Sequence, residues 1–106
     1  MKDYASMSDF EINCRVHAEV MEISGLDSFK AKDYCNNPAD AWPIIIGQKL
    51  SLINADDEWL CVPDYATVDG VAGDDIQKIY FSYGYVDANP LRCAMVVFLM
   101  MKEGEK

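Results

Sequence analysis

The feature that most constrains this sequence is an unbroken apolar run near its C-terminal end. Every residue from Cys93 to Met101 is apolar. Asn89 and Pro90 precede the run; asparagine is a favoured N-cap, and proline suits the first helical position, where no backbone N–H is needed. The pattern predicts a helix that starts at Pro90 and is apolar almost all round. Because such a helix must be covered on most sides, we expect it at the centre of the core.

Length and charge narrow the choice of architecture and partner. The chain has 106 residues, of which 51% are hydrophobic, which suits one domain with its own core over residues 1–106. The formal net charge is −9. Nucleic-acid backbones and anionic lipids both attract basic surfaces. We therefore expect no direct nucleic-acid contact and no membrane partner.

Cysteine spacing and the N-terminal sequence bear on compartment and metal binding. The chain begins without the basic segment and apolar run of a secretory signal. The four cysteines are far apart, with no CxxC pair, and the chain has one histidine, His17. Cysteines in this pattern are typical of reduced core residues rather than of zinc ligands. We expect a cytoplasmic protein without a metal or cofactor.

An amphipathic helix is predicted near the N-terminal end, over residues 8–23. Ser8 and Glu11 have the spacing of a capping box, and apolar residues recur at helical intervals after them. Gly25 suits the end of the helix. His17 falls on the apolar stripe, which favours a core or edge histidine over a catalytic base.

The next segment predicts a strand and a short helix. Residues 28–34 alternate weakly, as in a short strand. Proline is disfavoured inside helices, but with Asp40 as N-cap, Pro43 falls in the first turn, where its missing N–H costs little. We therefore expect a helix over 41–48.

The rest of the chain predicts a small antiparallel sheet. Residues 50–53 and 58–62 are β-like and are joined by a hairpin loop at 54–57. The Gly- and Asp-rich segment 63–75 indicates a loop, and 76–86 alternates as a strand does. The fold class is therefore α+β, with a small antiparallel sheet packed against the amphipathic N-terminal helix and the apolar C-terminal helix.

Three segments of the chain carry a family resemblance: DYASMSDFEIN, DYCNNPADAWPIII and NPLRCAMVVFLMM. In this order they resemble the NinX-like family of small phage and prophage proteins. The resemblance implies an accessory protein made in the cytoplasm of a bacterial host. It implies no catalytic residues, so none is transferred to this chain. The stretch from 63 to 86 departs from the family's pattern.

One candidate site is a small-ligand pocket near the two Asn-Pro pairs. A helix N-terminus offers free N–H groups to an anion, a tryptophan offers a stacking face, and an arginine can bind an anion in a bidentate manner. The residues are Asn37, Asp40, Trp42, Asn89 and Arg92. The alternatives are structural: the Asn and Asp residues as caps, Trp42 in the core, and Arg92 paired with an acid.

A second candidate site is an acidic surface. Between Lys49 and Lys78 the chain contains no Lys or Arg but seven acids. They are Asp56, Asp57, Glu58, Asp64, Asp69, Asp74 and Asp75. They form either a solvated region that keeps the protein soluble or a surface complementary to a basic host protein.

The sequence favours a binding protein over an enzyme. Nucleophilic catalysis needs a Ser, Cys or Thr beside a base, and no such pair is apparent. The leading hypothesis is a non-enzymatic phage or prophage accessory protein that binds a basic host protein. The alternative is a small-ligand binder, for example one that sequesters nucleotides. The aromatic residues Phe81, Tyr83 and Tyr85 of the predicted strand are more often sheet core, but they would favour a homodimer if one face of the sheet were exposed.

Overall fold

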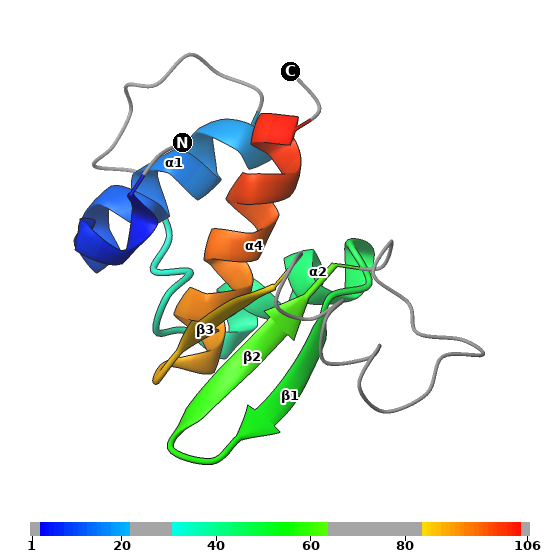
Figure 1. Ribbon diagram of the computed structural model, residues 1–106. Coiled ribbons are helices and arrows are strands. Elements are labelled where there is room, and N and C mark those ends of the chain that lie inside the picture. Colours follow the sequence, from blue (N-terminus) through cyan, green and yellow to red (C-terminus); the bar gives the residue numbers. More distant parts are fainter. Residues whose placement is uncertain (1–2, 22–30, 64–83, 105–106) are drawn as a thin grey trace.

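The computed structural model describes residues 3–21, 31–63 and 84–104 (Figure 1). These residues form a 3-10 turn, three α-helices and a three-stranded antiparallel sheet, which confirms the predicted α+β class. The elements are the turn Tyr4–Ser6, α1 (Asp9–Met21), α2 (Pro38–Gly47), β1 (Ser51–Ala55), β2 (Glu58–Val62), β3 (Tyr85–Asp87) and α4 (Pro90–Gly104).

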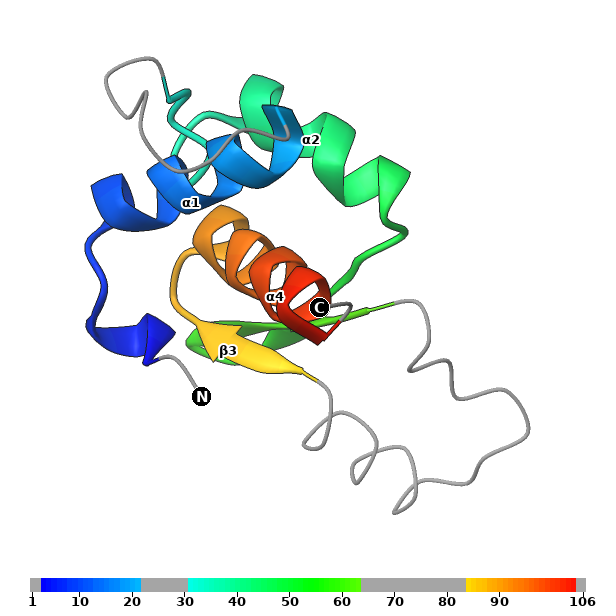
Figure 2. The same ribbon diagram turned by 90° about the horizontal axis from the view of Figure 1, so that it is seen from above.

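Helix α4 is the centre of the described fold. It lies between the sheet on one side and helices α1 and α2 on the other (Figure 2). Residues 92–99 are all buried. The predicted start is confirmed, because the Asn89 side-chain oxygen accepts hydrogen bonds from the N–H groups of Leu91 at 2.9 Å and Arg92 at 3.3 Å. Coverage by two layers thus explains why the helix has almost no polar face.

The last turn of α4 is held by the N-terminal segment. The helix continues beyond its apolar run to Gly104. The Tyr4 hydroxyl donates a 2.6 Å hydrogen bond to the Glu103 carboxylate, which fixes the last turn against the N-terminal segment. Burial first, and this hydrogen bond second, raise the pKa of Tyr4 to about 12. Residues 105–106 lie outside the described part.

Helix α1 has the predicted N-cap and half of the predicted capping box. The Ser8 hydroxyl accepts a 3.1 Å hydrogen bond from the Glu11 N–H. The Glu11 carboxylate lies 3.7 Å from the Arg15 Nε, one turn along the exposed face. The buried face includes Ile12 and Val16. The predicted helix end at 22–23 lies outside the described residues.

Helix α2 starts three residues earlier than predicted. Its N-cap is Asn37, not Asp40: the Asn37 side chain accepts a 3.0 Å bond from the Ala39 N–H, and Pro38 is the first helical residue. Pro43 therefore lies inside the helix, where it removes one backbone hydrogen bond. Burial of Ala41 and Ile45 on the inner face compensates for that loss. An Asn-Pro pair thus starts both α2 and α4.

No strand is present at 31–34, the described part of the predicted strand 28–34. The cause is Asn13 of α1. Its side chain donates to the Asp33 carboxylate at 2.9 Å and accepts from the Cys35 N–H at 2.9 Å. The segment is therefore bonded to a helix and ends in a turn at 34–36. Residues 28–30 lie outside the described residues.

The predicted hairpin is confirmed, with a shorter loop. β1 and β2 pair from Ser51 opposite Val62 to Ala55 opposite Glu58, so the turn has two central residues, Asp56 and Asp57. Asp56 has φ 68°, as in the primed turns whose twist suits hairpins.

The third strand is only partly described. β3 pairs antiparallel with β2 and ends at Asp87, one residue beyond the predicted strand. The rest of that prediction, 76–83, and the predicted loop from 64 onward lie outside the described residues. In the described part of the chain, no helix is long and apolar enough to cross a membrane.

Candidate functional site

The two Asn-Pro helix starts lie against each other. The Asn89 side-chain amide donates to the Cys35 carbonyl at 2.7 Å and to the Asn36 side-chain oxygen at 3.3 Å. We call the polar cluster at this contact the Asn-Pro junction. It consists of Asp9, Asp33, Asn36, Asp87, Asn89 and Arg92.

Arg92 holds the junction together. Its Nε donates to the Asp87 carboxylate at 3.2 Å, and its Nη1 donates to the Asp9 carboxylate at 2.5 Å. Its Nη2 donates to the backbone carbonyls of Tyr4 at 3.0 Å and Met7 at 2.7 Å. The residue is only 9% exposed. One side chain on α4 therefore ties down β3, α1 and the N-terminal segment at once.

The charge of Arg92 is neutralised inside the molecule. Burial by itself lowers the pKa of Arg92, but the hydrogen bond to Asp9 and the charges of Asp87 and Asp9 outweigh burial and raise it. The guanidinium is therefore permanently charged and paired with two carboxylates. This pairing matches the structural alternative given for Arg92 from the sequence, an ion pair with an acid. An external anion would have to displace bonds that the fold uses.

The other predicted ligand residues are spread along α2. Asn37 caps the helix, and Asp40 lies in its first turn. Trp42 is 55% exposed, so it does not pack into the core as its structural alternative required. Ile46, one turn later, is similarly exposed. In the described residues, no hydrogen bond or ring contact joins Trp42 to the Asn-Pro junction.

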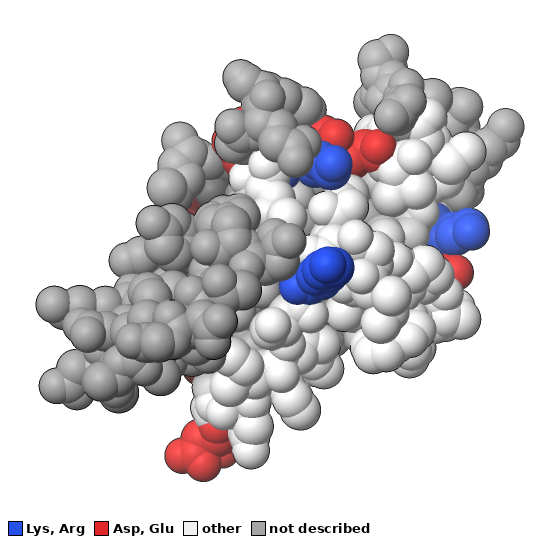
Figure 3. Space-filling model, turned by 90° about the vertical axis from the view of Figure 1, so that its right-hand side faces the viewer, with Lys and Arg blue, Asp and Glu red and all other residues white. Residues whose placement is uncertain are grey.

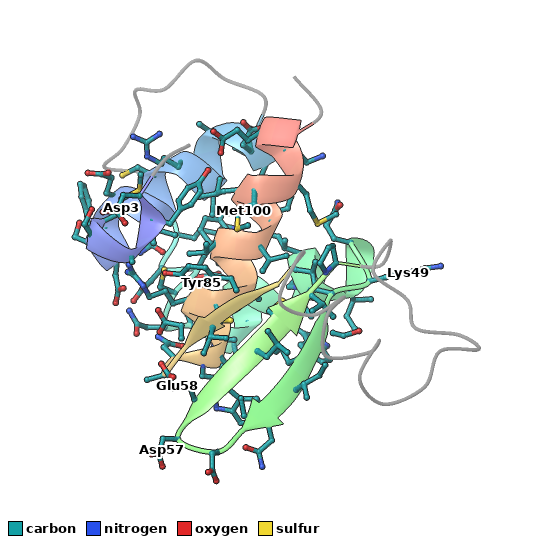
Figure 4. The ribbon with its side chains drawn as sticks, in the orientation of Figure 1. Asp3, Lys49, Asp57, Glu58, Tyr85 and Met100 are labelled. Atoms are coloured by element: carbon teal, nitrogen blue, oxygen red, sulfur yellow. The ribbon has the colours of Figure 1, made fainter. Side chains whose placement is uncertain are left out.

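Three of the seven predicted surface acids are described, and they lie together. Asp56, Asp57 and Glu58 form the turn of the hairpin and the start of β2, and all three are exposed. We call them the hairpin tip. Seen from the β1 side, acidic atoms stand at the lower end of a described surface that is mostly uncharged (Figure 3). Asp57 points away from the helices (Figure 4).

The other four acids of the predicted surface are Asp64, Asp69, Asp74 and Asp75. They lie outside the described residues, so the hairpin tip is the part of the predicted acidic surface that the structure describes. Within the described chain, no hydrogen bond or ion pair engages the carboxylates of the tip. The charges of the three tip residues are therefore exposed to solvent.

The buried cysteines are neutral thiols. Burial is the main cause that raises the pKa of Cys35, Cys61 and Cys93 to about 12. The Cys93 thiol also donates to the Tyr85 carbonyl at 2.9 Å. These three residues are free thiols in the core, as predicted. A thiol in this state is a poor nucleophile and a poor metal ligand.

His17 is half-buried at the edge of the α1 contact surface. Its Nδ1 lies 3.3 Å from the Tyr34 hydroxyl. Burial, followed by the charge of Asp40, raises the pKa of Tyr34. The pair therefore links α1 to the turn before α2, as an edge histidine would.

Sequence reasoning missed the acids that hold Arg92 and the role of Asn13. Asn13 is a buried polar residue on the inner face of α1. The signal available was its position three residues before the buried Val16, on the side of the helix expected to be apolar. Asp9 and Asp87 carried no such signal, because each becomes a partner of Arg92 only through the fold.

Comparison with known proteins identifies the family. The family model described as Bacteriophage P22, NinX matches residues 3–102. A search of curated proteins and a search of solved structures each returned no match. The family match confirms the resemblance seen in the three sequence segments. Because it spans nearly the whole chain, the chain belongs to the NinX family of bacteriophage P22.

Proposed function

We propose that this phage accessory protein acts without catalysis, by binding a basic host protein in the bacterial cytoplasm through its acidic surface. Family membership supports the accessory role. The observation that favours the binding role is the hairpin tip, whose three carboxylates are exposed and unengaged among the described residues. Asp64, Asp69, Asp74 and Asp75 would extend the same surface.

The hairpin presents these carboxylates on an ordered support. β2 is hydrogen-bonded to β1 on one side and to β3 on the other, and a two-residue turn closes the hairpin. Because the hairpin is already ordered, it loses little conformational freedom on binding, and the entropic cost of association is lower. Clustered negative charge also speeds encounter with a Lys- or Arg-rich partner and selects against acidic ones.

The chemistry of the described core supports a role other than catalysis. The buried thiols are neutral, the Arg92 guanidinium is held by the protein's own acceptors, and His17 faces a tyrosine hydroxyl. The guanidinium and the imidazole thus have structural partners, and the thiols are buried in the core. None of them combines a nucleophile, a base and an orienting group, as covalent catalysis requires.

Affinity capture with matched variants tests the proposal. The tip variant carries Asp56→Asn, Asp57→Asn and Glu58→Gln. The control variant carries Asp3→Asn, Glu11→Gln and Glu19→Gln, which changes the net charge equally but at other positions. We expect the wild type and the control to retain the same basic protein from a bacterial lysate. The tip variant should retain about tenfold less, and raising the salt to about 0.5 M should release the partner.

Two results would contradict this function. One is the absence of any defined partner above background. The other is equal retention by the tip and control variants, which would show that only total charge matters.

A small-ligand site on α2 is the second candidate, favoured by one observation. The exposed ring of Trp42 could stack on a nucleotide base, with Asn37 and Asp40 at the start of the same helix. Support from Asn89 and Arg92 is weaker, because both are engaged in the Asn-Pro junction. Nucleotides should then raise the melting temperature, and Trp42→Ala should abolish the rise. A flat response across nucleotides would remove this candidate.

A further inference from the structure

Two buried cysteines from distant parts of the chain lie at the contact between the sheet and helix α4. Cys61 is in β2, and Cys93 is near the start of α4. Both are fully buried, and both are free thiols of the core. Neither belongs to the hairpin tip, so what they can do together is independent of the proposed function.

The sulfur of Cys93 lies against the part of the sheet that carries Cys61. The Cys93 thiol donates to the Tyr85 carbonyl at 2.9 Å and to the Trp59 carbonyl at 3.3 Å. Tyr85 is the cross-strand partner of Cys61, and Trp59 precedes Cys61 by two residues in β2. The Cys93 sulfur therefore lies over the β2–β3 ladder, beside Cys61.

The Cys61 side chain points to the same side of the sheet. Successive side chains of a strand point to opposite faces. Cys61 belongs to the buried cluster that contains residues 93–99 of α4, whereas its neighbour Leu60 is only half-buried. Burial first, and the charge of Cys93 second, raise the pKa of Cys61. The two sulfur atoms thus share one face of the sheet and are close enough to interact.

We propose that Cys61 and Cys93 form a disulfide bond when the protein is exposed to a low-molecular-weight disulfide such as oxidised glutathione. One thiolate attacks the small disulfide, forms a mixed disulfide and releases one small thiol. The second protein thiolate attacks the protein sulfur of the mixed disulfide and releases the other small thiol. Two electrons pass from the protein thiols to the small disulfide, and the two protons pass to the small thiols released.

Burial controls when this exchange occurs. A buried neutral thiol is a poor nucleophile, so the first attack is slow while the core is closed. It proceeds when the sheet opens from α4, and refolding then brings the two sulfur atoms together. The oxidised protein has a covalent bond from β2 to α4. Because this bond closes a loop of the unfolded chain, it also stabilises the fold.

Cys35 provides a matched control for this selectivity. It is equally buried, and burial is also the main cause that raises its pKa to about 12. Its sulfur lies 3.9 Å from the Asp9 carbonyl oxygen of α1, on the other side of α4 from the sheet (Figure 2). In an unfolded chain, the entropy of loop closure favours cysteines closer in sequence, which are the pairs Cys14–Cys35 and Cys35–Cys61.

Disulfide mapping of the full chain tests the proposal. The protein is incubated with oxidised glutathione in urea just below the unfolding transition, free thiols are blocked, and the linked peptides are identified by mass spectrometry. We expect one main intramolecular product, Cys61 linked to Cys93. Cys35→Ala should give the same product, and Cys61→Ala should not. In urea that unfolds the chain, the pairs that contain Cys35 should predominate instead.

The urea midpoint of the oxidised protein provides the second measurement. We expect it to be higher than that of the reduced protein, and dithiothreitol should reverse the change. The proposal is overturned if the folded protein forms no intramolecular disulfide, or if its main disulfide contains Cys14 or Cys35. It is equally overturned by a lower midpoint in the Cys61–Cys93 form, because the bond would then distort the folded geometry.

Discussion

The Asn-Pro junction and the hairpin tip are both polar, and they differ in what their charges meet. At the junction, Arg92 is bonded to two carboxylates and two backbone carbonyls. At the tip, three consecutive acids face solvent. The polar residues that looked most like a binding site are therefore part of the scaffold. The charges available to a partner lie in the hairpin turn, which is made by residues that are neighbours in the sequence.

The difference follows from how each region is assembled. The junction brings together residues far apart in the chain, such as Tyr4 and Arg92, and buries them against the core. A charge removed from water in this way must be paired, or folding would be opposed by several kcal/mol. The tip is made by neighbours in sequence and remains hydrated, so its charges need no partner within the chain.

Removing Arg92 should have the largest effect. Arg92→Ala leaves Asp9 and Asp87 without their cation and removes one hydrogen-bond donor from each of the Tyr4 and Met7 carbonyls. We expect a loss of about 3–5 kcal/mol in the free energy of unfolding, measured by urea denaturation. Arg15→Ala is the control, because Arg15 forms an exposed pair with Glu11, and should cost less than about 0.5 kcal/mol. Equal losses in the two variants would contradict the structural role of the junction.

Replacing the two N-cap asparagines should have the next largest effect on stability, and the two variants should differ. Asn37 accepts one capping bond, whereas Asn89 accepts two and also donates to the Cys35 carbonyl. We expect Asn37→Ala to cost about 1 kcal/mol and Asn89→Ala about 2 kcal/mol, by chemical denaturation. If Asn37→Ala cost as much as Asn89→Ala, the contact between the two helix starts would contribute nothing.

Alkaline pH should weaken the core through its thiols. The pKa of Cys61 rises from 9.0 to about 12 on folding, chiefly through burial, so the folded state holds the proton more tightly. Its contribution is fully present below pH 9 and is lost as pH rises toward 12, at about 1.4 kcal/mol per pH unit. The slope of unfolding free energy against pH above 9 should therefore be shallower in Cys61→Ala. An unchanged slope would show that Cys61 does not remain protonated in the folded protein.

Neutralising the hairpin tip should have the smallest effect on stability. The tip variant removes three exposed charges that no described residue pairs. We expect its free energy of unfolding to stay within about 0.5 kcal/mol of the wild type. A loss above about 1 kcal/mol would mean that these acids support the fold, which would weaken the contrast with the junction.

Local signals in the sequence predicted much of the fold. The start of α4, the N-cap of α1 and the hairpin depend on neighbouring residues such as Asn89-Pro90 and Ser8, and all are confirmed. The start of α2 was predicted three residues too late, because Pro43 was expected in the first turn, whereas Asn37 caps the helix and Pro43 lies inside it.

Contacts between residues far apart in the chain could not be predicted from the sequence. The strand predicted at 28–34 was wrong where it is described, because a side chain of α1 holds that segment. Likewise, the sequence suggested that Arg92 would be paired, but not that Asp9 and Asp87 were its partners. Both outcomes depend on contacts between elements distant in the chain.

The most direct test compares partner binding by one variant from each region. With the captured host protein, affinity is measured for the tip variant and for Asn89→Ala, at equal concentrations of folded protein. We predict at least about a tenfold loss for the tip variant and a change of less than about twofold for Asn89→Ala. A loss at Asn89→Ala with full binding by the tip variant would contradict the assignment, and would return the binding role to the Asn-Pro junction.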